Sequence, residues 1–371
     1  MYRYQYGLLK NEAIYIAGPE CFYTNGYDML AAMRKRAESL GFRVTLPNEH
    51  PLDMNNNDFR KRADSIFADL KAAMNASTVI IADLEAYRGA EPDSGTIFEI
   101  GMAYARGIRS YGYTRDKRSL AAKNQQAVLK NGMVYDERGN VMPYAELPFS
   151  PTIIGSTKIV EGDFDDCLRA LMVDIEEEYK AKAIGEINVS KLLPERQAGT
   201  KPLVYLSGFE RYETSGESIY KRMKEICTGY GLKAVSPSDT ADGIQKKETD
   251  NPYIWAASQF ANYQQHVRNC DIIIANLNDY RGYEIANDVG FECGMGFQLG
   301  KRLYGYMDNT DFLIHRIPNL GEEKEFRDHT GSNVENFNYP ANLMFACSMK
   351  LFEGKFEEII AEVAIDLSMG L

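Results

Sequence analysis

A long internal repeat constrains this chain more than any other feature of its sequence. The segment 67–107 aligns without a gap on the segment 260–300, at a constant offset of 193 positions. A Tyr-Arg-Gly tripeptide, for example, begins at Tyr87 in the first segment and at Tyr280 in the second. A gapless match over this length indicates that the chain is a tandem duplication of one folding unit.

The match continues toward both ends of each copy. Residues 14–20 correspond to 204–210, and Glu161-Gly162 corresponds to Glu353-Gly354, with slightly different offsets that indicate short insertions in loops. A chain of 371 residues is long enough for two domains of about 150 residues each, so a single compact core is the weaker interpretation.

The stretch between the copies predicts the domain boundary. It is polar from about Ala181 to Lys201 and loses its apolar periodicity after Leu193. We therefore predict a first domain, a linker and a second domain over residues 1–182, 183–201 and 202–371.

Each copy reads as short apolar strands separated by helical patterns. In the first copy, strands are predicted at 13–17, 42–46, 78–83, 109–113 and 158–160, helices near 27–40, 58–75, 96–106 and 164–180, and a hairpin over 133–144 that turns at 137–140. Continuous apolar strands followed by helices indicate an α/β, doubly wound domain whose parallel sheet is covered on both faces. Such a sheet binds ligands beyond the carboxyl ends of its strands, so we expect the chemistry in the loops after Ala17 and Asp83.

Charge and composition disfavour several classes of function. With 42 Lys and Arg residues against 53 Asp and Glu residues, the net charge of −11 disfavours binding to nucleic acid or to an anionic membrane. The sequence has no run of 18 apolar residues and no signal-peptide pattern at its start, so we expect a cytoplasmic protein. The cysteines and histidines lack the spacing of a metal site, and no phosphate-binding glycine motif is present, so we expect neither a metal nor a cofactor.

Glu99, one turn into an otherwise apolar helix, is the main candidate for catalysis. One interpretation is a capping box, in which Thr96 caps the helix and Glu99 reaches back to its backbone N–H. The second copy weakens this interpretation, because it keeps the glutamate as Glu292 and replaces the threonine by Val289. The other interpretation is a carboxylate that the helix dipole keeps ionised and that attacks a carbon centre.

Three aspartates supply further acidic groups around the same end of the sheet: Asp69, Asp83 and Asp93. A pair of carboxylates, one nucleophilic and one proton-donating, is the minimal equipment for retaining cleavage of a glycosidic bond. Taken singly, each aspartate also fits a solvated loop residue or a helix cap.

Three segments of the first copy are informative together: IYIAGPECF near the N-terminus, FADL, and EPDSGTIFEIGMAYA. They resemble the motifs of the nucleoside 2-deoxyribosyltransferases, which exchange the base of a 2-deoxynucleoside. The resemblance covers nearly all of the first copy and, more weakly, the second. It implies a flavodoxin-like sheet, in agreement with the strand and helix pattern.

The resemblance also implies roles for individual residues. Glu99 is the nucleophile that forms an ester with C1′ of the deoxyribose, and Tyr15 hydrogen-bonds to that carboxylate and orients it. Asp69 and Asp93 face the base, and one of them carries a proton to and from a ring nitrogen. Tyr15 also fits an ordinary buried strand residue.

The resemblance places the base pocket in the loop after the first strand, where Glu20 and Phe22 line it and Phe22 stacks on the base. Residues 48–50 are further candidates for contact with the base, but they align only loosely, so the choice between purines and pyrimidines stays open. Deoxyribose is the expected sugar, because a 2-hydroxyl would destabilise an oxocarbenium-like transition state.

The second copy has lost its acidic groups. Asn262, Asn276 and Ala286 stand where the first copy has Asp69, Asp83 and Asp93. An amide or a methyl group cannot protonate a departing base, so we expect the second copy to be a poor catalyst on its own.

The family also uses an asparagine from a neighbouring subunit to hold the sugar, and Asn342 in Pro-Ala-Asn-Leu-Met carries this motif in the second copy. The first copy has Ser150 at the equivalent place. The complementary losses predict an internal pseudo-dimer with one composite site, which Asn342 completes; a further homo-oligomer stays open. The alternative for Asn342 is a loop residue that satisfies a turn.

Two other functions stay open. The first is hydrolysis of deoxynucleosides or their 5′-monophosphates, by an enzyme that uses a similar glutamate. The acidic loop at 18–20 argues against a substrate with a phosphate, whereas Arg88 and Arg106 argue for one. The second is nucleotide sensing by a non-catalytic module, because duplicated domains of this class also serve as sensors.

Overall fold

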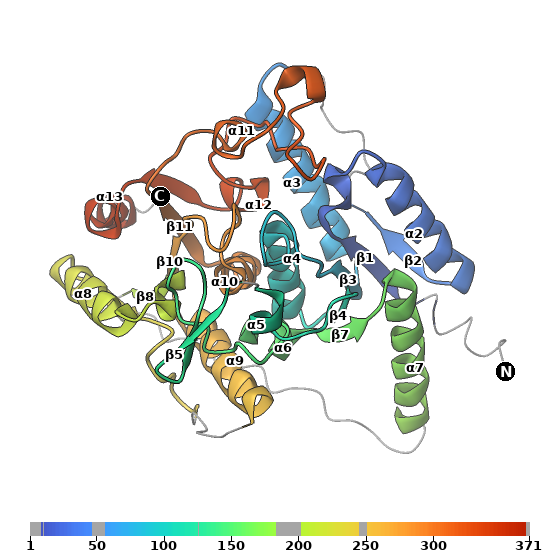
Figure 1. Cartoon of the computed structure of the whole chain (residues 1–371), viewed down its shortest axis with the longest axis horizontal. Coiled ribbons are helices and arrows are strands. Elements are labelled where there is room, and N and C mark those ends of the chain that lie inside the picture. Colours follow the sequence, from blue (N-terminus) through green and yellow to red (C-terminus); the bar gives the residue numbers. More distant parts are fainter. Residues whose placement is uncertain are drawn as a thin grey trace.

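The computed structural model describes residues 9, 11–46, 56–124, 126–182, 202–244 and 251–368 (Figure 1). The predicted linker, 183–201, and the candidate base loop, 48–50, lie outside the described residues. No helix in the described ranges combines the length and the apolar character needed to cross a membrane.

The first domain is built on a five-stranded parallel sheet. Its order is β2-β1-β3-β4-β7, with β1 at Ala13–Ala17, β2 at Arg43–Thr45, β3 at Val79–Asp83, β4 at Arg109–Thr114 and β7 at Lys158–Glu161. The second sheet repeats this order as β9-β8-β10-β11-β12, with β8 at Leu203–Ser207, β9 at Lys233–Val235, β10 at Ile272–Asn276, β11 at Arg302–Met307 and β12 at Lys350–Glu353. This order is the flavodoxin-like one, so the predicted fold class and the tandem duplication are confirmed.

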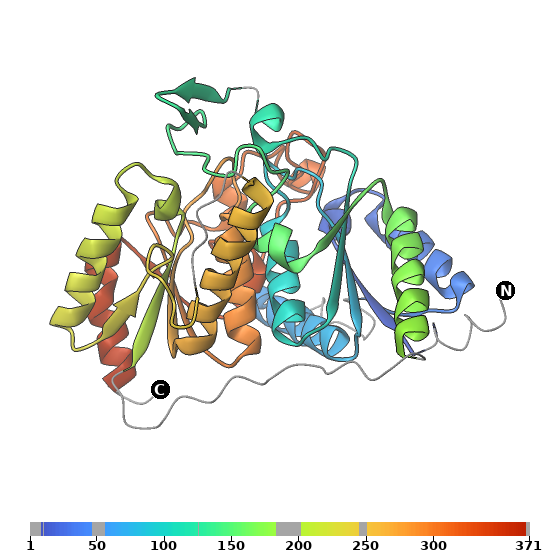
Figure 2. The same cartoon turned by 90° about the horizontal axis from the view of Figure 1, so that it is seen from below.

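Helices cover both faces of each sheet (Figure 2). The outer faces carry α2 (Gly26–Leu40) and α7 (Phe164–Lys182) in the first domain, and α8 (Gly216–Gly229) and α13 (Phe356–Ser368) in the second. The inner faces carry α3 (Phe59–Asn75), α4 (Ser94–Ala105), α9 (Pro252–Asn269) and α10 (Asn287–Gln298). Strand alternation supplies both cores, since Ile14 and Ile16 pack toward the outer helices and Tyr15 and Ala17 toward the inner ones.

The two domains pack through α4 and α10, which lie side by side at the centre of the molecule (Figure 1). Two equivalent glycines allow this approach: a Cβ atom on Gly101 would collide with the backbone oxygen of Phe291, and one on Gly294 with that of Phe98. The inner helices of both domains share one continuous hydrophobic core. The chain therefore folds as the predicted internal pseudo-dimer, with the reciprocal contacts of a two-fold interface.

The repeated Tyr-Arg-Gly tripeptides form matching ion pairs across this interface. Arg88 Nε lies 2.9 Å from Asp328 Oδ2, and Arg281 Nε lies 3.1 Å from Asp136 Oδ2. All four side chains are buried, and the glycines that follow the two arginines pair in a β-bridge. Each arginine therefore fixes a loop of the opposite domain.

A hairpin projects from the first domain (Figure 2). Its strands, β5 (Val128–Lys130) and β6 (Met133–Tyr135), are joined by Asn131 and Gly132, whose positive φ angles of 52° and 77° define a type I′ turn that the sequence analysis missed. The predicted turn at 137–140 follows it, and a bridge between Tyr135 and Val141 closes this second reversal. The remaining short helices are η1 (Pro19–Phe22), α5 (Leu120–Lys123), α6 (Pro151–Ser156), η2 (Phe209–Tyr212), α11 (Leu313–Arg316), η3 (Glu322–Lys324) and α12 (Leu343–Ala346).

Candidate active site

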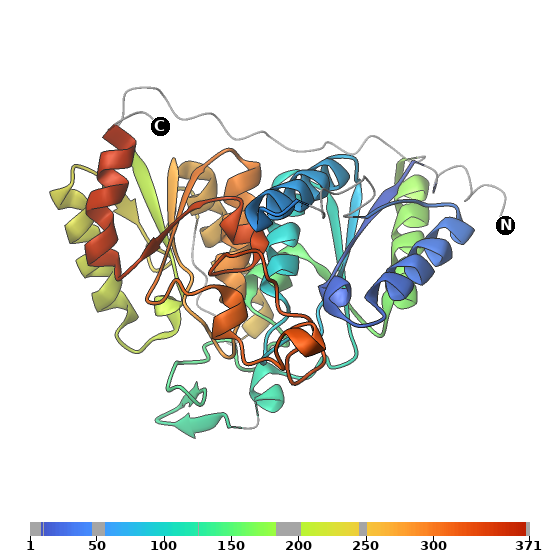
Figure 3. The same cartoon turned by 90° about the horizontal axis from the view of Figure 1, so that it is seen from above.

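A cavity of about 450 Å³ lies beyond the carboxyl ends of β1 and β3. Its walls come from the loop after β1, from the start of α4 and from residues 325–344 of the second domain. The helix α12 (Leu343–Ala346) of the second domain contacts α3 and α4 of the first domain. Figure 3 shows the second domain meeting the first along α3 and α4. The two domains therefore enclose this cavity together.

Glu99 lies in the wall of this cavity, one turn into α4, and its Oε1 accepts a hydrogen bond of 2.6 Å from the Tyr15 hydroxyl. The capping-box interpretation is wrong. The cap of α4 is Asp93, whose side chain accepts a hydrogen bond from the backbone N–H of Thr96. Glu99 therefore has no part in capping α4, because Asp93 supplies the N-terminal cap.

Burial controls the charge of Glu99. Removal from water raises its pKa to about 8, and the negative charges of Asp93 and Glu20 add to the rise, whereas the hydrogen bond from Tyr15 lowers it. At neutral pH most of the Glu99 carboxyl is therefore protonated, so the expectation that the helix dipole keeps it ionised is wrong. The fraction that ionises receives one strong hydrogen bond and little solvation, which leaves it reactive toward an electrophilic carbon.

Asp93 lines the same cavity. Its Oδ2 accepts hydrogen bonds from the N–H and the hydroxyl of Thr96, at 2.7 and 2.6 Å, while its Oδ1 has no hydrogen-bond partner among the described residues. Burial raises the pKa of Asp93. The site thus holds a second buried acid with one oxygen left for another group.

Phe22 and Asn342 also line the cavity. The ring of Phe22 stacks on Tyr87 with 5.9 Å between centroids. Asn342 caps α12 by accepting a hydrogen bond of 2.9 Å from Met344 N, and it lies so close to Gly95 that a Cβ there would be 2.9 Å from its Nδ2. Glycine at 95 therefore gives the second domain's amide the room to enter this cavity.

Glu20 and Asp69 are not among the described residues that form the cavity wall. Glu20 is fully buried, and its Oε1 accepts a hydrogen bond of 2.7 Å from the Tyr113 hydroxyl of β4. Its neighbours Cys21 and Phe22 face the cavity in its place. Asp69 is buried on α3; burial is the main cause of the raised pKa of Tyr15, and the charge of Asp69 adds to it.

The equivalent place in the second copy is closed by an arginine. Glu292 accepts hydrogen bonds from Tyr205 at 2.8 Å, from Ser207 at 2.5 Å, and from both terminal nitrogens of Arg211 at 2.8 and 2.7 Å. Arg211 stands where the first copy has Cys21. This difference was not predicted, although the alignment of the two copies contains it.

A second substitution completes the closure. Asp288 stands where the first copy has Gly95, and it accepts hydrogen bonds from Tyr212 and from Thr152 of the first domain. The space that Ser150, Tyr212 and Asp288 line measures about 10 Å³, roughly the volume needed for one water molecule. Within the described residues, the second copy has no room for a nucleoside.

These features define the class of the protein: a two-domain α/β enzyme with one open, carboxylate-based site for a small molecule. A family model described as nucleoside 2-deoxyribosyltransferase matches residues 14–143 and 204–344, which is more than half of the chain. The chain belongs to the nucleoside 2-deoxyribosyltransferase family, with one family domain in each copy. Transfer of deoxyribosyl groups is therefore its general activity.

Several solved structures are similar to this chain over different shares of its length. A 2-desoxiribosyltransferase from Leishmania mexicana is 26% identical, with 44% of this chain and 97% of that chain covered and a TM-score of 0.34. A glycotransferase of kitacinnamycin is 10% identical, with 96% and 91% covered and a TM-score of 0.24. No curated protein matches the chain. The assignment to the family therefore rests on the family model.

Proposed function

We propose that the protein moves the 2-deoxyribosyl group of a deoxynucleoside from one nucleobase to another, through a covalent ester between C1′ and Glu99. The observation that carries this proposal is the Tyr15–Glu99 hydrogen bond of 2.6 Å in the wall of a cavity that Asp93 and Asn342 also line. The second copy serves as the part of the site that holds the sugar, through Asn342.

The reaction has two balanced steps. In the first, an oxygen of Glu99 bonds to C1′ as the bond from C1′ to the base nitrogen breaks, and the departing base takes the electron pair and a proton from an acid of the site. In the second, the nitrogen of an incoming base displaces Glu99 from C1′ and returns the proton. Tyr15 orients the carboxylate throughout and stabilises its charge when the ester breaks.

The charges around the cavity favour a nucleoside over a 5′-monophosphate. None of the described lining residues is Lys or Arg. Arg88 is held by Asp328, and Arg106 donates to the backbone oxygens of Met74 and Asn75. Arg88 and Arg106, the two arginines that had argued for a phosphate, are therefore both occupied by other groups. The carboxyls in the cavity wall would also repel a phosphate.

Incubation of the protein with a deoxynucleoside and a different free base tests the proposal. A new deoxynucleoside, absent with the Glu99→Gln variant, is the expected product. Free deoxyribose without exchange would instead indicate a hydrolase, and binding without chemistry a sensor. The double variant Arg211→Met and Glu292→Gln is the matched control in the second copy, because it removes both charges of that ion pair together and leaves the open site intact.

A further inference from the structure

Glu335 of the second domain lines the open cavity, and no role was expected for it. It is buried, with 8% of its surface exposed. Its Oε2 accepts one long hydrogen bond of 3.2 Å from Leu343 N, and its Oε1 has no hydrogen-bond partner among the described residues. In the first copy the equivalent position is Pro143, so the closed site has no such carboxyl.

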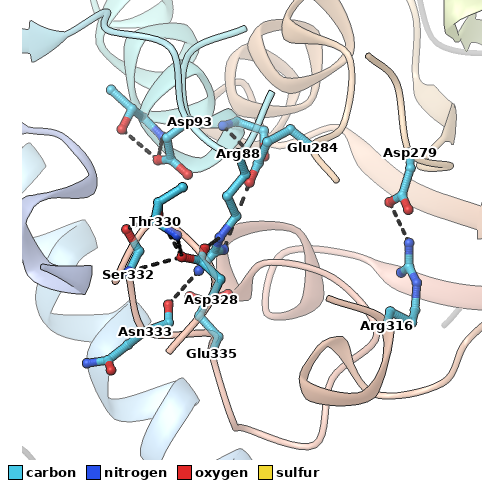
Figure 4. Close-up of polar contacts among 12 residues, drawn as sticks. Arg88, Asp93, Asp279, Glu284, Arg316, Asp328, Thr330, Ser332, Asn333 and Glu335 are labelled. Atoms are coloured by element: carbon cyan, nitrogen blue, oxygen red, sulfur yellow. Dashed lines mark hydrogen bonds and ion pairs between the residues drawn. The ribbon is translucent and has the colours of Figure 1, made fainter. Parts of the chain in front are cut away.

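Glu335 belongs to a buried cluster in which acids outnumber bases (Figure 4). The one arginine in this cluster is Arg88, which lies 2.9 Å from Asp328, donates to Asn333 O at 2.5 Å and lies 4.0 Å from Glu284. Within the part of the chain that the structure describes, its side-chain hydrogen bonds go to Asp328 and to Asn333 O, and none goes to Asp93 or to Glu335. The charge of Asp93 acts on Glu335 within this buried cluster, and a proton held by one of the two carboxyls relieves the repulsion between them.

The hydrogen bonds decide which of the two acids holds that proton. Asp93 accepts from two groups of Thr96 and lies at the N-terminus of α4, and both features favour its ionised form. Glu335 has only the long hydrogen bond from Leu343 N. Burial and the negative charge of Asp93 raise the pKa of Glu335 to about 8, so its neutral form prevails at neutral pH.

We propose that Glu335 is the acid that protonates the leaving base, with Asp93 as its ionised partner. The proposal rests on the proposed function and names the acid of its first step. The proton on Glu335 passes to the base nitrogen as the C1′–N bond breaks, and Glu335 becomes a carboxylate. It takes the proton back from the incoming base as Glu99 leaves C1′, so no other reagent is needed.

Several ionisable groups face Glu335 and govern its titration: Asp93 on α4, Arg88 in the loop after β3, Glu284 in the equivalent loop of the second domain, Cys21 in η1 and Cys347 after α12. Burial raises the pKa of Cys21, and burial raises that of Cys347 to about 12, so both thiols stay neutral. The negative charges of Asp93 and Glu284 therefore oppose ionisation of Glu335, and Arg88 favours it.

The test compares two leaving bases. The base of 2′-deoxyguanosine needs a proton to leave, whereas that of its N7-methyl derivative already carries a positive charge. Glu335→Gln keeps an acceptor for Leu343 N but cannot give up a proton. We expect kcat to fall about 100-fold or more with 2′-deoxyguanosine and less than about threefold with the methylated substrate. Glu323→Gln, an exposed glutamate of η3 that is not among the residues lining the cavity, is the matched control and should change neither rate.

The pH dependence gives a second readout. With 2′-deoxyguanosine, kcat/KM of the unmodified protein should fall above about pH 8 as Glu335 loses its proton, and this fall should be absent with the methylated substrate. Equal losses on both substrates in Glu335→Gln would overturn the proposal. So would a leaving-base dependence that appears in Asp93→Asn and not in Glu335→Gln. Unmodified protein that exchanges no base would instead overturn the proposed function, and this proposal with it.

Discussion

Cysteine at position 21 keeps the first site open, and this can be tested by giving it the arginine of the second copy. In Cys21→Arg, the guanidinium should hold both oxygens of Glu99 as Arg211 holds those of Glu292, at 2.8 and 2.7 Å. Each hydrogen bond of this charged kind contributes about 1.5–3 kcal/mol. Attack on C1′ must break one or both of them, so we expect single-turnover base release to slow by about 10- to 100-fold for one bond and by about 10²- to 10⁴-fold for both.

The control separates charge from bulk. Cys21→Met adds a long side chain without a positive charge, and we expect it to retain more activity than Cys21→Arg. Base release is followed by chromatography after rapid quenching, with melting curves to verify the fold. Full activity in Cys21→Arg, or an equal loss in Cys21→Met, would refute the explanation by ion pairing.

Three further variants test separate parts of the site. Tyr15→Phe removes the hydrogen bond that lowers the pKa of Glu99, so the rising limb of the pH–rate profile should move to higher pH and kcat should fall about tenfold. Asn342→Ser retains a cap for α12 but loses the amide, so kcat/KM should fall about tenfold while the melting temperature stays unchanged. Unchanged kinetics would rule out a site shared by the two domains. Burial and the charge of Glu20 raise the pKa of Asp83 to about 7, so the folded state keeps a proton that the unfolded chain releases near pH 4. The free energy of unfolding therefore falls as the pH rises from about 4 to about 7. Asp83→Asn should raise the free energy of unfolding by about 1–4 kcal/mol at pH 8 and by little at pH 4, as measured by urea unfolding.

The sequence predicted the features that repeat and the features that follow strand periodicity. The duplication follows from the match between the two copies, and the strands of the first sheet follow from the apolar runs within one copy. The placement of Glu99 beside Tyr15 was implied by the family resemblance. Phe22 and Asn342 were expected near the substrate, and the structure places both in the cavity wall. Their roles remain part of the proposed function.

The pairing of the two domains was predicted, but several details of the packing between them were not. Glu335 reaches the cavity only because its loop is fixed across the interface by Arg88, and no periodicity marks it. Glu20 was expected in the wall, but the turn of η1 directs it toward Tyr113 instead. Arg211 is different, because its position opposite Cys21 in the repeat already indicates that the two sites differ in charge.

The ester on Glu99 is the central claim, and mass spectrometry of the acid-quenched protein tests it most directly. After incubation with a deoxynucleoside and no acceptor base, the protein should gain the mass of one deoxyribosyl group, and digestion should locate that mass on the peptide that contains Glu99. The Glu99→Gln variant should gain nothing. Exchange activity without any adduct, or an adduct on a different residue, would contradict the account.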